Sequence, residues 1–149
     1  VALSELVAGV IAANLPLAEA RRIDLGAMPT TGEAVVDGEE EALRILISNL
    51  VSNAVRYTPH GGKVDVTVGA GADGPFIDVC DTGPGIPAEE RERVFDRFYR
   101  RAQNDEAGSG LGLAIVRRIA ERHRASVVLD EAPLGGLRAR VQFQRSVTP

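Results

Sequence analysis

The sequence predicts one α/β domain, in which helical segments are interleaved with short strands, and three observations support this. Segments 3–22 and 38–56 repeat apolar residues at the spacing of a helix that buries one side. Segments 63–68 and 76–80 have the alternating or apolar pattern of strands, with glycine-rich sequence between them. At 149 residues, 44% of them apolar, the chain is long enough for a single domain with its own core.

Segment 3–22 is expected to form an amphipathic helix. Pro16 interrupts the pattern, and a proline inside a helix removes a hydrogen bond and crowds the preceding turn. We therefore expect the helix to bend or break near Asn14. The sequence opens on Val1 already inside this helical pattern, so we expect the chain to be part of a longer protein.

Two short strands, 23–25 and 34–36, are expected next, with a Pro-Thr-Thr-Gly turn between them. The second long helix, 38–56, follows, and Asp37 is its expected N-cap because a short acidic side chain can accept the free N–H groups of a first turn. Three acidic residues stand in that turn, where the helix dipole favours them: Glu39, Glu40 and Glu41.

One side of the 38–56 helix carries two amides and a guanidinium, from Asn49, Asn53 and Arg56. They are four and then three residues apart, so they share a face of the helix. Polar side chains on such an apolar helix are costly to bury unless a polar group fills the space beside them. They are candidates for contacting a polar ligand, and the alternative is an ordinary solvated face.

The two strands 63–68 and 76–80 form a predicted hairpin that leads to Asp81, with its turn at 69–74. The sheet therefore holds this carboxylate at the start of a loop. Gly83 and Gly85 let the backbone adopt positive φ and approach a flat ligand without a Cβ in the way. A carboxylate beside bare backbone suits a nucleobase with an exocyclic amine, although a tight surface turn has the same pattern.

After a short helix opened by Pro87, segment 94–101 holds three aromatic residues and segment 102–107 is polar and without a pattern. An aromatic segment beside a loose loop that ends in a glycine cluster suits a closing lid, at about 100–109. An ordinary surface loop would have the same polar sequence without a pattern.

The glycine cluster itself, Gly-Ser-Gly-Leu-Gly-Leu at 108–113, leads into a helical run at 114–122. Glycines that open onto a helix expose N–H groups at the positive end of its dipole, which suits phosphates. A dinucleotide fingerprint is excluded because it needs glycine in place of Leu113, and a P-loop is excluded because no Gly-Lys-Ser/Thr occurs. Lys63, the only lysine, has no eukaryotic kinase signature around it. The chain closes with two further strands, 126–130 and 137–143.

Composition excludes several classes of protein. The net charge of -4 and the pI near 5.2 argue against a nucleic-acid surface, which needs clustered cations. The single cysteine, Cys80, excludes an internal disulfide and fits a reducing compartment; its strand position predicts a buried, unreactive side chain. We see no apolar run of membrane-spanning length and no signal pattern at the start.

Four blocks, in this order and spacing, resemble the catalytic ATP-binding domain of bacterial sensor histidine kinases. They are N-L-V-S-N-A-V-R-Y at 49–57, D-T-G-P-G at 81–85, F-D-R-F at 95–98 and G-S-G-L-G at 108–112, and they match that family's N, G1, F and G2 boxes. The resemblance covers essentially the whole chain, 1–149. It implies a two-layer α/β (α+β) sandwich of the GHKL or Bergerat type, with a mixed β-sheet on one side, helices on the other, and ATP between the helices and the lid.

The resemblance implies that Asp81 accepts the adenine amine, that Tyr57 lines the base and that Asn53 holds Mg²⁺ through its side-chain oxygen. Arg97 and Arg100 are implied to contact the γ-phosphate, and Asn49 and Arg97 to be the catalytic residues. The nucleotide-binding positions implied are, in full, Asn49, Asn53, Arg56, Tyr57, Asp81, Gly83, Gly85, Ile86, Phe98, Arg100, Gly108, Ser109, Gly110, Leu111, Gly112 and Leu113.

Asn49 bears on the reaction, because related gyrase-type ATPases have a water-activating glutamate at the matching place. An amide cannot serve as a general base, so its presence favours holding ATP for transfer over hydrolysing it. The alternatives are a GHKL-type ATPase, a serine kinase, or a degenerate module that uses the fold for protein contact.

In the family that the blocks resemble, the acceptor histidine lies on a separate dimerising hairpin, and this chain contains none of it. His60 and His123 are expected to be surface residues. The resemblance therefore implies a cytoplasmic domain, monomeric in isolation, that binds Mg-ATP without phosphorylating itself. Its expected partners are that hairpin, docked on the first helix and the aromatic segment, and a response regulator through it; neither nucleic acid nor direct membrane contact is expected.

Overall fold

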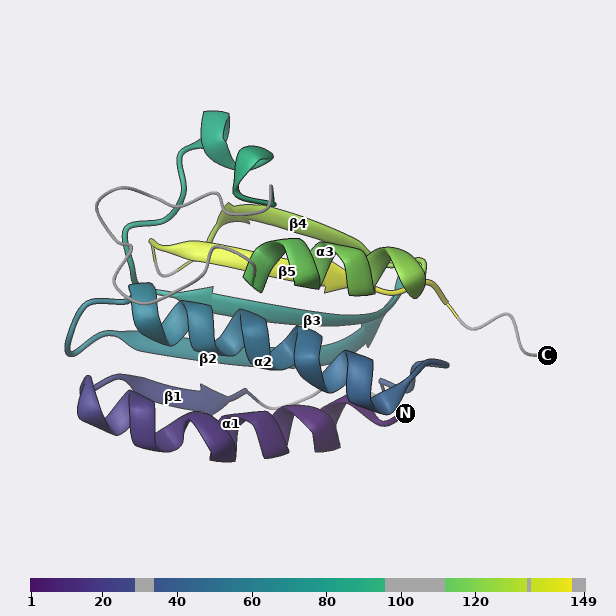
Figure 1. Ribbon diagram of the computed structural model, residues 1–149, viewed down its shortest axis with the longest axis horizontal. Helices are drawn as coiled ribbons and strands as arrows, with labels where there is room; N and C mark the ends of the chain where they lie inside the picture. Colours follow the sequence, from purple (N-terminus) through teal and green to yellow (C-terminus); the bar gives the residue numbers. More distant parts are fainter. Residues whose placement is uncertain (29–33, 96–111, 134, 146–149) are drawn as a thin grey trace.

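The computed structural model describes residues 1–28, 34–95, 112–133 and 135–145. Within them, three helices lie on one face of a five-stranded sheet (Figure 1). The helices are α1 (Leu3–Ala20), α2 (Glu40–Tyr57) and α3 (Gly112–Arg122), and the strands are β1 (Asp24–Ala27), β2 (Lys63–Gly71), β3 (Gly74–Asp81), β4 (Ser126–Glu131) and β5 (Leu137–Gln142). Two 3₁₀ turns follow β3, namely η1 (Ala88–Glu90) and η2 (Arg93–Phe95).

The sheet is mixed, with strand order β1-β2-β3-β5-β4. The β1–β2 pair is parallel and the other three pairs are antiparallel. This two-layer arrangement of a mixed sheet under helices confirms the predicted fold class. Asp81 ends the central strand β3, where it is paired with Val64 of β2.

The core lies between the helices and the inner face of the sheet. Seven residues of α2 are buried, at the spacing the sequence predicts: Leu43, Leu46, Ile47, Leu50, Val51, Ala54 and Val55. They belong to one cluster with alternate residues of the central strands: Val64, Val66, Ile77, Val79 and Val141. Burying one such aliphatic side chain is worth ~1.5–3 kcal/mol, so this layer holds α2 firmly against the sheet.

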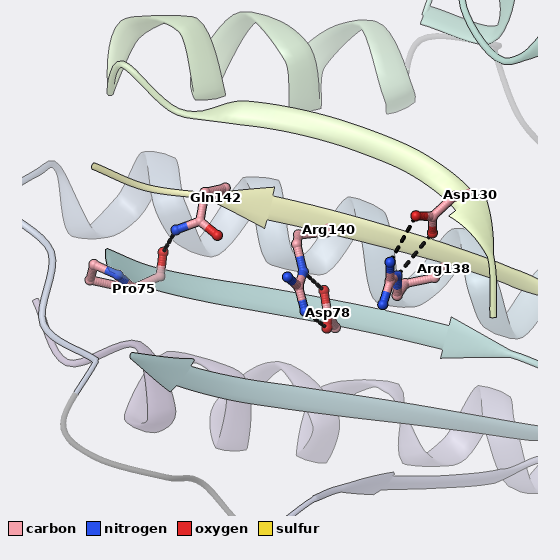
Figure 2. Close-up of polar contacts among 6 residues, drawn as sticks. All are labelled: Pro75, Asp78, Asp130, Arg138, Arg140 and Gln142. Carbon is pink, nitrogen blue, oxygen red and sulfur yellow. Dashed lines mark hydrogen bonds and ion pairs between the residues drawn. The ribbon is translucent and has the colours of Figure 1, made fainter. Parts of the chain in front are cut away.

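The outer face of the sheet carries charged pairs, as Figure 2 shows, and none of the described helices covers it. The guanidinium of Arg140 binds both carboxylate oxygens of Asp78 at 2.6 Å and stacks 4.5 Å from the Phe76 ring centroid. Arg138 binds both oxygens of Asp130 at 2.8–2.9 Å. These bidentate pairs connect β5 to β3 and to β4, so side chains as well as backbone fix the strand register.

Helix α1 continues to Ala20 through Pro16, so of the predicted bend or break near Asn14, the break does not occur. Asn14 is itself helical, and its side-chain amide donates to the Val10 carbonyl at 2.9 Å. By length and composition alone α1 could cross a membrane, with 18 residues at a mean hydropathy of 1.3, which contradicts the expectation that no such segment exists. Its apolar side, however, packs on α2 and β1 as a core helix does.

The start of α2 differs from the prediction. Segment 34–36 is not a strand, since only Val35 forms a β-bridge, with Ala2. Asp37 is not the N-cap: the cap position is Glu39, whose side chain makes no capping hydrogen bond. The Glu39 N–H instead donates to His123 Nε2 at 3.1 Å, and His123 Nδ1 lies 2.8 Å from the Ile119 carbonyl. His123 is therefore a half-buried structural residue at the end of α3, not a surface residue.

Two smaller expectations about the hairpin are also corrected. β2 extends to Gly71 and β3 begins at Gly74, so the turn is shorter than 69–74. Cys80 is half-buried because it points to the outer face of the sheet, opposite Val79. Burial and the Asp78 carboxylate raise the pKa of its thiol to about 11, which keeps it protonated at neutral pH.

Candidate functional site

Asp81 is held at the centre of the candidate site by the pleat of β3. It follows Ile77 and Val79 at two-residue intervals, so its carboxylate faces the helix layer and not the outer face. Only 6% of the residue is exposed. Its Oδ1 accepts hydrogen bonds from the N–H of Gly83 at 2.9 Å and of Leu137 at 3.0 Å. Within the described residues Oδ2 accepts none, and it is therefore available to a ligand donor.

The electrostatics of Asp81 combine opposing effects. Burial raises the pKa of the carboxyl above its ordinary value, and the two backbone N–H groups partly offset this by stabilising the carboxylate. A carboxylate that has lost much of its water but keeps one free oxygen gains strongly from a ligand N–H, since the alternative is an unpaired buried acceptor.

Glycines leave the space around Asp81 free of side chains. A Cβ on Gly83 would lie 3.1 Å from the Tyr57 carbonyl and 3.2 Å from Asp81 Oδ1. A Cβ on Gly136 would overlap Asp81 outright, and Gly85 adopts φ +72°, which a side chain disfavours. The predicted role of Gly83 and Gly85 in shaping a close backbone approach is consistent with this geometry. Gly136, which precedes the strand predicted at 137–143, was not among the predicted site residues.

The amides of α2 meet the first residue of α3. A Cβ on Gly112 would lie 3.2 Å from Asn53 Nδ2 and 3.4 Å from Asn49 Oδ1, so glycine there lets α3 approach both side chains. Asn49 Nδ2 donates to the Ile45 carbonyl at 3.0 Å, and no described residue donates a hydrogen bond to the amide oxygen. Two amides therefore lie at the N-terminus of a helix, where the dipole favours anions.

A pocket of about 480 Å³ adjoins this site on the side of Tyr57. Its walls are Arg21, Arg56, Tyr57, Pro59, Thr82, Gly83 and Pro84. Three of these, Arg56, Tyr57 and Gly83, are predicted site residues, whereas Asp81 and the two asparagines do not line it. Arg21 donates to the carbonyls of Val55 and Thr58 at 3.1 Å, and thereby supports the end of α2.

Thr58 is a polar residue of this region that sequence reasoning missed. It is fully buried, and its Oγ1 has no hydrogen-bond partner within the described residues. It borders Gly83, since a Cβ there would lie 3.5 Å from the Thr58 Cα. No local pattern predicts such a residue: Thr58 is the C-cap residue of α2, and a threonine followed by proline after a helix is typical of an exposed turn.

The remaining predicted residues divide into two groups. Ile86 is buried near the Asp81 loop, and Leu113 is half-buried beside the core at the start of α3. The others lie outside the described residues: Arg97, Phe98, Arg100, Gly108, Ser109, Gly110 and Leu111. Phe95, which precedes them, ends η2 and is buried.

A metal ion would find few protein ligands here. The described residues contain no group of three or more His, Cys, Asp or Glu side chains that could hold one. Mg²⁺ commonly takes one or two protein oxygens and completes its shell with phosphates and water, so the amide oxygen of Asn53 suits it only together with a phosphorylated ligand.

A buried carboxylate facing bare backbone at the end of β3, and two amides of α2 at the N-terminus of α3, are features of a nucleotide-binding domain of the α/β sandwich type. The chain belongs to the histidine kinase-, DNA gyrase B- and HSP90-like ATPase family, whose model matches residues 38–147. Within it, the resemblance to sensor histidine kinases is confirmed by similar proteins, so this is a histidine kinase-type ATP-binding domain.

One relative is the sensor histidine kinase RppB of Synechocystis, 40% identical over 133 residues, which are 87% of this chain and 29% of that protein. The solved structure of the mycobacterial sensor histidine kinase MprB superposes with a TM-score of 0.84 at 29% identity and covers 99% of both chains. The solved structure of full-length ShkA in complex with AMPPNP superposes with a TM-score of 0.81 at 28% identity. The match covers all of this chain and 32% of that one. The chain thus spans less than a third of the curated relatives' length.

Proposed function

We propose that this domain binds Mg-ATP and donates the γ-phosphate to a histidine on a separate dimerisation domain, from which it passes to a response regulator. The observation that carries the proposal is the Asp81 carboxylate, with one oxygen fixed by two backbone N–H groups and the other without a hydrogen bond from any described residue. That oxygen accepts the exocyclic amine of adenine. A guanine carbonyl at the same place would set two acceptors against each other and be rejected.

The phosphates extend from the base toward the N-terminus of α3. Asn53 and Asn49 lie against Gly112 there, and Arg56 supplies a cation one helical turn further along α2. Asn53 would hold the magnesium ion, which neutralises phosphate charge when bound. Arg97, Arg100 and the glycines at 108–110 are proposed to complete the phosphate contacts, and Tyr57 to line the base.

Phosphoryl transfer depends on positioning of the reactants more than on covalent catalysis by the protein. Phosphoryl transfer proceeds through a loose transition state that is stabilised by aligned groups and neutralised charge. Asn49 has no basic group to activate water, so ATP is held for an external acceptor. The acceptor hairpin, the response regulator and a cytoplasmic location are parts of the same proposal, supported by the sensor kinases that the chain resembles.

The test has two steps. Calorimetric titration with Mg²⁺ and a non-hydrolysable ATP analogue should give a single binding site, with much weaker binding of the GTP analogue. Incubation with labelled ATP and a supplied dimerisation domain should then label that domain with acid-labile phosphate. Acid-stable label would indicate a serine kinase, and rapid release of inorganic phosphate without any acceptor would indicate an ATPase. Either result would overturn the proposal.

A further inference from the structure

The C-terminal end of α2 is held by a side chain from another helix. Arg21 is the C-cap residue of α1, at the side of the helix layer where α2 also ends (Figure 1). Its Nε donates to the Val55 carbonyl and its Nη2 to the Thr58 carbonyl, both at 3.1 Å. The last carbonyls of a helix lack partners within the helix, so an arginine that binds two carbonyls here fixes the helix end. The two residues between these contacts are Arg56 and Tyr57.

The backbone that carries the Arg21 side chain is itself fixed. The Arg21 N–H donates to the carbonyls of Leu17 and Ala18 at 3.2 Å, and the Ile23 N–H donates to the Ala18 carbonyl at 2.8 Å. Arg22 adopts φ +56°, so α1 ends in a Schellman motif, which closes the last turn. The Arg21 side chain therefore extends from an ordered point and can hold α2 in one position.

The end of α2 also contacts the loop that follows Asp81. A Cβ on Gly83 would lie 3.1 Å from the Tyr57 carbonyl and 3.5 Å from the Thr58 Cα. Arg21, Tyr57 and Gly83 line the same pocket of about 480 Å³. A shift of the helix end would therefore change the distance between Tyr57 and this loop.

We infer that Arg21 is a positioning residue for the nucleobase. The inference rests on the proposed function, in which Tyr57 lines the base and Asp81 binds its amine. By holding the carbonyls on either side of Tyr57, Arg21 sets the space between that side chain and the Asp81 loop. A flat ring that enters this space is held well only if both walls are in place.

The experiment compares a nucleotide with the nucleoside that lacks its phosphates. In Arg21→Met, which keeps the aliphatic stem but donates no hydrogen bond, the affinities for Mg-AMPPNP and for adenosine should both fall about 3- to 10-fold. The two factors should be equal, because the exposed side chain of Arg56 is long enough to adjust to a small shift, whereas the Tyr57 ring follows its backbone. A loss confined to Mg-AMPPNP would mean that Arg21 acts on the phosphates through its charge. That result, or unchanged affinity for both ligands, would overturn the inference.

A double-mutant cycle tests whether the effect passes through Tyr57. Tyr57→Leu removes the aromatic ring, so adding Arg21→Met to it should lower the affinity for Mg-AMPPNP by less than about 2-fold. A further loss as large as that of Arg21→Met alone would show another route and would contradict the inference.

The matched control is Arg22→Met. Arg22 is exposed, and its side chain makes no hydrogen bond or ion pair within the described part of the chain. Its substitution removes the same charge one residue away and should leave both affinities unchanged; a loss equal to that of Arg21→Met would refute the role of the two hydrogen bonds. Arg21→Lys, which keeps the charge and a donor, should retain part of the affinity. If Arg21→Met does not fold, Arg21→Lys is compared with Arg22→Lys by the same criteria.

Amide hydrogen exchange tests the hold on α2 without nucleotide. The Thr58 N–H donates to the Ala54 carbonyl at 3.1 Å, at the end of the helix. Its exchange should accelerate in Arg21→Met and not in Arg22→Met. If the wild-type chain binds neither ligand, the proposed function fails and the role for the base fails with it, while faster exchange would still support the hold of Arg21 on α2. Equal exchange in the two variants would refute that hold itself.

Discussion

Asp81→Asn should separate nucleotide binding from folding. The asparagine oxygen can keep the hydrogen bonds from Gly83 and Leu137, since both partners only donate. The position of Oδ2 becomes an NH₂ group, which faces the adenine amine donor to donor. Losing a hydrogen bond to a charged acceptor costs ~1.5–3 kcal/mol, so affinity for the ATP analogue should fall about 10- to 150-fold.

The free energy of unfolding of Asp81→Asn should be equal to or higher than that of the wild type. Burial raises the pKa of Asp81, so the ionised carboxylate destabilises the fold at neutral pH and the neutral amide removes that cost. Calorimetric titration gives the affinity and urea unfolding gives the stability of the same sample. Unaltered affinity would refute the assignment of Oδ2, and a loss of more than ~1 kcal/mol of stability would refute the account of the hydrogen bonds.

The raised pKa of Asp81 also determines how the stability of the fold and the affinity for nucleotide should change with pH. Because the folded-state pKa of Asp81 is higher than 3.8, the folded chain binds more protons than the unfolded chain between 3.8 and that raised value. Relative to Asp81→Asn, wild-type stability should therefore increase as pH falls through this window. Nucleotide affinity should decrease over the same window, because a protonated carboxyl no longer accepts from the amine. Parallel unfolding curves for the two proteins across this range would contradict the argument.

Three further outcomes are expected. Gly136→Ala should displace Asp81, because the added Cβ would overlap it. The affinity for the ATP analogue should therefore fall more than the affinity for an analogue that lacks the 6-amino group, and an equal loss of affinity for both would contradict this prediction. His123→Phe should cost ~1 kcal/mol in urea unfolding because the N–H of Glu39, the N-cap residue of α2, loses its acceptor, whereas the exposed His60→Phe should cost nothing measurable. Cys80 should react slowly with iodoacetamide at pH 7, since its thiol has a pKa of about 11, and modification as fast as that of free cysteine would argue otherwise.

Local pattern predicted much of the site. The alternation of β3 places Asp81 on the inner face, and helical spacing places Asn49 and Asn53 together on α2. These are short-range consequences of backbone geometry, which a single sequence contains. The four ordered blocks then identified the family.

The residues that sequence reasoning missed act through distant partners. Leu137 donates to Asp81 across 56 positions of the chain, and His123 caps α2 across 84. Neither contact has a local signature, since backbone N–H groups look alike in every sequence and a histidine near a helix end is usually solvated. Asp37 is the reverse case. Its local sequence favours an N-cap, but the helix begins after Glu39, whose N–H donates to the distant His123.

The antiparallel pairing of α2 and α3 has a mechanical consequence. His123 holds the beginning of α2 from the far end of α3, and at the other end Gly112 lies against Asn53. A slide by a single residue would shift α3 by ~1.5 Å, which is enough to break the His123 hydrogen bond and to close the gap at Gly112. The two helices therefore move as one body, and a force applied at the His123 end is transmitted along α3 to the amides at the other.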